Sequence, residues 1–117
     1  MKQLTREEAR AILAPLTHGQ WLTAGRMLMP SGIHKERMGS LKEVYWFLEP
    51  SSRSLPAIDF DRLANWLETA LEDTQTAEQV RNASATCTSY VETCKSVYAL
   101  IGARIKDAEG VLKNDLS

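Results

Sequence analysis

Two cysteines and two histidines are the residues of this sequence best suited to metal binding or redox chemistry. Cys87 and Cys94 are seven residues apart, and His18 and His34 are the only histidines. Their spacings match no zinc finger, zinc ribbon or His-x-x-x-His pair. On a helix the two cysteine Cα atoms would lie about 10.5 Å apart, which is too far for a disulfide. The sequence therefore predicts reduced thiols in a packed core, with no metal and no cofactor.

Asp59 and Asp61 form the one candidate pair for acid–base catalysis. Both stand at the expected start of a helix, where carboxylates accept hydrogen bonds from free backbone amides and are stabilised by the helix dipole. Capping therefore accounts for the pair. The chain has no glycine-rich phosphate loop, nucleophile elbow, Ser-x-x-Lys or His-Glu-x-x-His pattern. These observations predict that the protein is not an enzyme.

Basic residues in the segment 20–42 suggest contact with nucleic acid. A helix-turn-helix needs a glycine at its turn and apolar residues that hold the second helix down, and Gly32, Met38 and Leu41 fit these positions. Pro30 opposes this interpretation because it interrupts the first helix. The alternative is a plain helix-loop-helix with a basic polar face. The candidate nucleic-acid contacts are His34, Lys35, Arg37 and Lys42.

The strongest pattern covers residues 76–112, where apolar and small residues alternate steps of four and three. Such a heptad predicts one continuous helix, about 55 Å long at 1.5 Å per residue. The capping-box letters at Ser89–Glu92 fall inside this helix, so they do not predict a helix start. The core positions of the heptad are the candidate face for self-association or for a partner, and they include Val80, Cys87, Val91, Cys94, Tyr98, Ile101 and Ile105.

Shorter helices are expected within residues 1–48. The segments Thr5–Glu8 and Thr17–Gln20 both fit the capping box that begins a helix. The aromatic run 44–48 suits a helix by spacing and a strand by composition. We favour the helix, because no other segment offers a partner strand.

The remaining segments complete the expected fold. Residues 49–57 contain two prolines and predict a loop, and residues 58–73 predict a helix that folds back on the long one. We therefore expect residues 1–117 to form a single all-α domain. It would be a bundle of four or five helices with a long heptad-patterned C-terminal helix.

Composition limits the class of protein. The chain has 117 residues, of which 44% are hydrophobic and 25% charged, as is typical of one folded domain. Its net charge of −1 gives no overall attraction to nucleic acid or anionic lipid. The N-terminus is too polar for a signal peptide, and no apolar run reaches the ~18–20 residues of a membrane span. We expect a cytoplasmic protein that does not associate with membranes.

These patterns favour a non-enzymatic protein–protein interaction module, such as a small cytosolic regulator, adaptor or chaperone-like protein that acts through its helical faces. The heptad face is longer than the short helices can cover, so we expect a homodimer. The alternative is a DNA-binding regulator with a helix-turn-helix-like segment at 20–42 and a C-terminal dimerising helix. Titration with duplex DNA at low and moderate salt distinguishes the two, because phosphate contacts make binding strongly salt-dependent.

Overall fold

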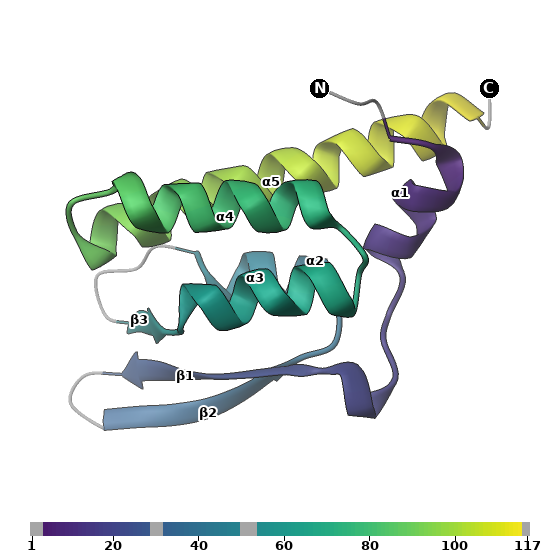
Figure 1. The fold of residues 1–117 in the computed structure, drawn as a ribbon. Helices are drawn as coiled ribbons and strands as arrows, with labels where there is room; N and C mark the ends of the chain where they lie inside the picture. The colour runs from purple at the N-terminus through teal and green to yellow at the C-terminus, as the bar shows by residue number, and fades with distance from the viewer. Residues whose placement is uncertain (1–3, 29–31, 50–53, 116–117) are drawn as a thin grey trace.

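The computed structural model describes residues 4–28, 32–49 and 54–115. In these ranges it contains five α-helices, one 3-10 helix (η1) and a three-stranded antiparallel sheet. The elements are α1 Arg6–Leu13, η1 His18–Gln20, β1 Leu22–Leu28, β2 Gly32–Met38, α2 Leu41–Phe47, β3 Ser54–Ala57, α3 Phe60–Thr69, α4 Thr74–Thr86 and α5 Tyr90–Asp115. Figure 1 shows the sheet on one side of α2 and α3, and α4 and α5 on the other. The protein is thus mostly helical with a long C-terminal helix, as predicted, but it is not purely all-α.

Two predicted helix starts are confirmed, each with its capping side chain. The Thr5 hydroxyl accepts a hydrogen bond from the Glu8 amide, and the Glu8 carboxylate accepts one from the Thr5 amide. This reciprocal capping box begins α1. Asp59 begins α3 by accepting a hydrogen bond of 2.9 Å from the Asp61 amide. α3 ends at Thr69, before the predicted end at residue 73, and Glu72 beyond it has a positive φ of 55°, a left-handed conformation that does not continue a helix.

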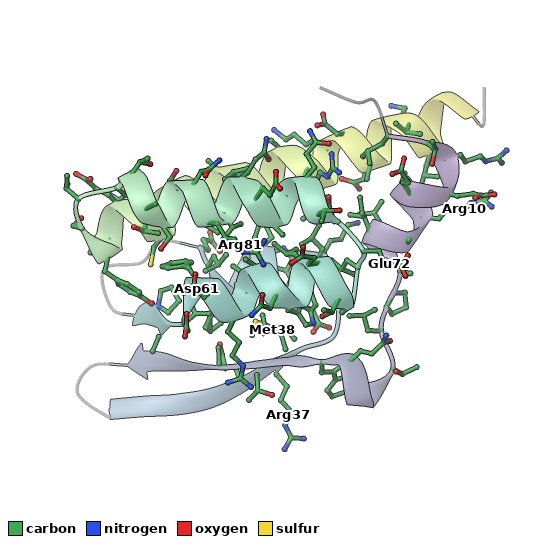
Figure 2. The ribbon with its side chains drawn as sticks, viewed as in Figure 1. Arg10, Arg37, Met38, Asp61, Glu72 and Arg81 are labelled. Carbon is green, nitrogen blue, oxygen red and sulfur yellow. The ribbon has the colours of Figure 1, made fainter. Side chains whose placement is uncertain are left out.

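Both interpretations of 20–42, the helix-turn-helix and the plain helix-loop-helix, are wrong, because this segment begins with a β-hairpin. β1 and β2 pair antiparallel over their full length, with Leu22 opposite Met38. Both of these side chains are buried, and Figure 2 shows Met38 pointing toward the helices and Arg37 pointing away from them. The box at Thr17–Gln20 produces only the single turn η1. Pairing of the strands and burial of Leu22 and Met38 outweigh the helix propensity of the leucine, alanine, arginine and methionine residues in β1.

The run 44–48 falls in and directly after the short helix α2, as its spacing predicts. Ser40 caps this helix, and its apolar residues three and four positions apart are buried. The predicted loop 49–57 is wrong at Ser54–Ala57, which form β3, and its residues 50–53 lie outside the described residues. β3 pairs with the free side of β1, giving the strand order β2-β1-β3. Pro56 is tolerated there because β3 is an edge strand, where a missing N–H can face away from the sheet.

The predicted continuous helix 76–112 is divided into α4 and α5. Residues 87–89 separate the two helices, which run antiparallel (Figure 1). The Ser89 hydroxyl accepts a hydrogen bond from the Glu92 amide, and the Glu92 carboxylate accepts hydrogen bonds from Thr88. These contacts satisfy the first free amides of a new helix. The capping-box letters that begin at Ser89 therefore mark a real helix start, contrary to our expectation.

A buried ion pair connects the start of α4 to the middle of α5. Asp73 caps α4 by accepting a hydrogen bond from the Thr76 amide. Arg104 donates to both carboxylate oxygens, with distances of 2.9 Å from Nε to Oδ2 and 2.7 Å from Nη2 to Oδ1. The Asp73 side chain is only 1% exposed and that of Arg104 is 11% exposed. Because both charges are removed from water, each depends on the other for solvation.

Candidate functional site

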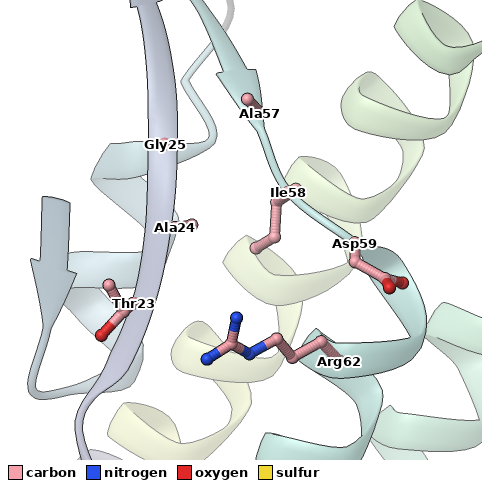
Figure 3. A pocket seen from close by; sticks show the side chains of 7 residues that line it. All are labelled: Thr23, Ala24, Gly25, Ala57, Ile58, Asp59 and Arg62. Atoms are coloured by element: carbon pink, nitrogen blue, oxygen red, sulfur yellow. The ribbon is translucent and has the colours of Figure 1, made fainter. Parts of the chain in front are cut away.

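A cleft of about 510 Å³ opens at the edge of the sheet, where β3 ends and the chain enters α3 (Figure 3). This volume lies within the range of about 300–1,000 Å³ that is typical of ligand sites. One wall is β1, with Thr23, Ala24 and Gly25, and the other includes Ile58, Asp59 and Arg62. The side chains of β1 at this position are small, so its backbone is accessible from the cleft.

The hydrogen bonds of β3 determine which backbone groups of β1 face this cleft. Pro56 lies opposite Arg26 in the register and has no N–H, and its carbonyl accepts a hydrogen bond from the Tyr90 hydroxyl on α5. The Pro56 carbonyl therefore points away from β1. In an antiparallel ladder the bonded pairs then fall on the neighbouring positions, such as Gly25 with Ala57.

The same alternation directs the N–H and C=O groups of Thr23 toward the β3 side of β1. β3 cannot reach them, because its ladder ends at the pair of Gly25 and Ala57 and the chain bends at Asp59 into α3. No strand in the described ranges continues beyond β3 along Thr23. The cleft therefore exposes one backbone donor and one acceptor of a strand edge, which are the groups that bind an extended chain.

Arg62 brings a positive charge to the same place. It is the third residue of α3, and Figure 3 shows its guanidinium extending across the cleft toward β1. No ion pair joins Arg62 to another described residue. Asp59 lies on the same wall but uses its Oδ1 to cap α3. The fork of guanidinium N–H groups is therefore available to bind a carboxylate.

Tyr90 fixes the wall opposite β1. Its hydroxyl donates to the Pro56 carbonyl and accepts a hydrogen bond of 3.0 Å from the Ile58 amide, while its ring packs at a tilt against Phe60. Burial raises the pKa of Tyr90, the hydrogen bond with Ile58 lowers it, and Cys94 raises it further, so the net direction is upward. The hydroxyl consequently remains protonated, and able to donate, throughout the neutral range.

We expect Tyr90→Phe to lower the free energy of unfolding by about 1 kcal/mol, because two backbone groups lose a partly buried partner. Since the folded pKa is raised, this contribution should be fully present below the unfolded pKa of about 10 and lost as pH rises through the folded value. Urea denaturation of both proteins across this pH range measures the difference. A difference that stays constant with pH would contradict this account of Tyr90.

The residues predicted as a partner face lie mostly inside the protein. Val80, Cys94, Ile101 and Ile105 are buried, Cys87 and Tyr98 are partly buried, and Val91 is 48% exposed. The turn between α4 and α5 folds the heptad back on itself, so each half of the face is covered by the chain's own helices. A homodimer through this face stays a prediction, although the buried part of the face is covered in the folded chain.

The predicted nucleic-acid contacts do not share one helix. Lys42 on α2 forms an ion pair with Glu109 of α5, with 3.3 Å between Nζ and Oε2. Arg37 is exposed on β2, and the side chains of His34 and Lys35 lie outside what the structure describes. DNA binding therefore stays a prediction, but the helix that was expected to enter the major groove is replaced by the hairpin of β1 and β2.

The thiols and acidic groups give no second candidate site. Cys87 and Cys94 are free, and burial raises the pKa of Cys94 although its hydrogen bond with Tyr90 lowers it. A protonated, buried thiol is a poor nucleophile. Within the described ranges no three His, Cys, Asp or Glu residues are grouped to hold a metal ion. In the same ranges no helix has the length and apolar character required to cross a membrane.

The sequence did not point to Thr23 or Arg62. One signal was present, because a cation in the first turn of a helix is disfavoured by the helix dipole, and Arg62 occupies that turn. Comparisons with protein families, with curated proteins and with solved structures give no match to this chain. The function must therefore be argued from the geometry of the cleft.

Proposed function

We propose that this protein is a small cytosolic, non-enzymatic interaction module that binds an extended segment of a partner protein in the cleft between β1 and α3. The open strand edge at Thr23, beside the Arg62 guanidinium, is the observation that carries this proposal. In strand addition the main-chain hydrogen bonds provide affinity, and contacts with side chains provide specificity. In this cleft the backbone of Thr23 would provide the main-chain hydrogen bonds, and Arg62 would provide the side-chain contact.

The dimensions of the cleft support binding of a short segment. β3 is only four residues long and pairs with β1 from Gly25 onward, so the sheet leaves an opening directly beside it. A partner segment would extend the β3 side of the sheet along Thr23 and bury the partly exposed apolar surface of Ala24. The heptad face offers no comparable opening, because most of it is buried.

Charge reversal at Arg62 tests this proposal, with Arg37 as the matched control. Both arginines are exposed, but Arg37 points away from the body of the protein (Figure 2) and does not line the cleft. We expect Arg62→Glu to reduce capture of a partner by at least about tenfold, because it replaces an attractive charge with a repulsive one. Arg37→Glu should leave capture unchanged.

The measurement is quantitative affinity capture from cells of the native host, with circular dichroism to confirm that each bait is folded. A protein retained by the wild type and Arg37→Glu, and lost with Arg62→Glu, would support the cleft as the binding site. Recovery of the same proteins by all three baits, or of none above the bait-free control, would refute it.

A further inference from the structure

We infer that the cleft selects an acidic side chain, aspartate or glutamate, within the extended segment it binds; this inference rests on the proposed function. Two features of the cleft lead to it: the guanidinium of Arg62, which forms no ion pair with another described residue, and the direction from which Arg62 enters. The guanidinium determines the charge that the bound segment should carry, and the direction of Arg62 determines which part of the segment should carry that charge.

The charges favour one carboxylate over a more highly charged anion. Arg62 can form a bidentate, charge-assisted pair with a carboxylate. Asp59 lines the same wall and caps α3, but Figure 3 shows its carboxylate pointing away from the Arg62 guanidinium. One guanidinium balances one negative charge, so a second negative charge on the ligand would have no opposite charge among the described residues that line the cleft. The cleft is therefore matched to a single carboxylate and poorly matched to a phosphate dianion.

The position of Arg62 favours a side-chain carboxylate over a chain terminus. Arg62 enters the cleft from α3, and Figure 3 shows its guanidinium directed toward β1 near Thr23. In an extended segment the side chains project away from the strand to either face, whereas a terminal carboxylate continues along the strand. The end of the opening in the strand direction is occupied by Ala57, the last residue of β3. An acidic side chain thus reaches Arg62 more directly than a terminus does.

A phage library of random heptapeptides, displayed so that the peptides have no free C-terminus, tests this inference. The library is selected in parallel on the wild type, on Arg62→Gln and on Arg37→Gln. We expect peptides that share an aspartate or glutamate at one fixed position to be enriched on the wild type and on Arg37→Gln. As synthetic peptides with amidated ends, they should bind Arg62→Gln at least about tenfold more weakly. Exchange of the acid for its amide in the peptide should cause a similar loss.

Other outcomes overturn the inference. Enriched peptides without a fixed acid, enriched acidic peptides that bind Arg62→Gln equally well, or no enrichment at all would each do so. Binding only of peptides with a free C-terminal carboxylate, in a parallel synthetic series, would overturn the choice of a side chain. In each case the capture experiment still judges the proposed function separately, because it asks only whether a partner retained by the wild type and Arg37→Glu is lost with Arg62→Glu, and not which group of the partner Arg62 contacts.

Discussion

Replacement of Arg104 by methionine should lower the free energy of unfolding by about 3–5 kcal/mol, because a buried carboxylate loses its counter-charge. Asp73 is nearly inaccessible to water, and Arg104 donates to both of its oxygens. Methionine keeps much of the apolar length of arginine, so the loss of the charge rather than of packing should dominate. Urea denaturation followed by circular dichroism measures the change.

Arg81 provides the matched control for this prediction. It pairs with Glu68 at 2.7 Å, the same distance as in the shorter contact of the buried pair, but both side chains are about one-third exposed. Arg81→Met should therefore cost no more than about 1 kcal/mol. Adding Asp73→Asn to Arg104→Met should recover part of the loss, since asparagine can still cap α4 and carries no charge. Equal losses from the two single arginine variants would show that burial does not set the strength of these pairs.

Ile101→Ala should lower the free energy of unfolding by about 2–5 kcal/mol, as expected when a buried aliphatic side chain is truncated. Ile101 is 0% exposed and belongs to the core of the folded chain. Val91, on the same heptad face, is 48% exposed, and Val91→Ala should change stability by less than about 0.5 kcal/mol. Thermal or urea unfolding of the two variants measures this contrast.

Sedimentation equilibrium distinguishes this account from an intermolecular seam. If the heptad face belongs to the core of one chain, both variants should show the same mass as the wild type. If Ile101→Ala instead dissociated a dimer without loss of monomer stability, the face would join two chains, and the assignment of Ile101 to the core would be wrong.

The sequence was most informative where a helix start combined a cap with apolar periodicity. Thr5 and Asp59 met both conditions, and α1 and α3 begin as predicted. A strand is expected where β-branched residues are frequent and apolar residues alternate with polar ones. β1 met neither condition, because Leu22–Leu28 contains only one β-branched residue and its apolar residues also fit a helix. Its strand conformation depends on pairing with β2 and β3, which local propensity does not encode.

The cleft was less predictable than the helices, because its two main residues come from distant segments. Thr23 and Arg62 are brought together only by β3, and the prolines around that segment predicted a loop. Pro56 was nevertheless the relevant clue. A proline is compatible with an edge strand, and its missing N–H determines which backbone groups of β1 remain open. Such an effect follows from tertiary pairing and not from any motif.

The three-residue turn between α4 and α5 determines how many chains are needed to complete the fold. With the turn in place, the apolar stripe of the last two helices closes within one molecule. If residues 87–89 became helical, the stripe would extend along one straight rod, and α5 would lose the neighbours that cover it. Two chains could then restore the core only by exchanging their last helices, the arrangement known as domain swapping. The hydroxyl groups of Thr88 and Ser89 therefore favour the monomeric topology as well as capping a helix.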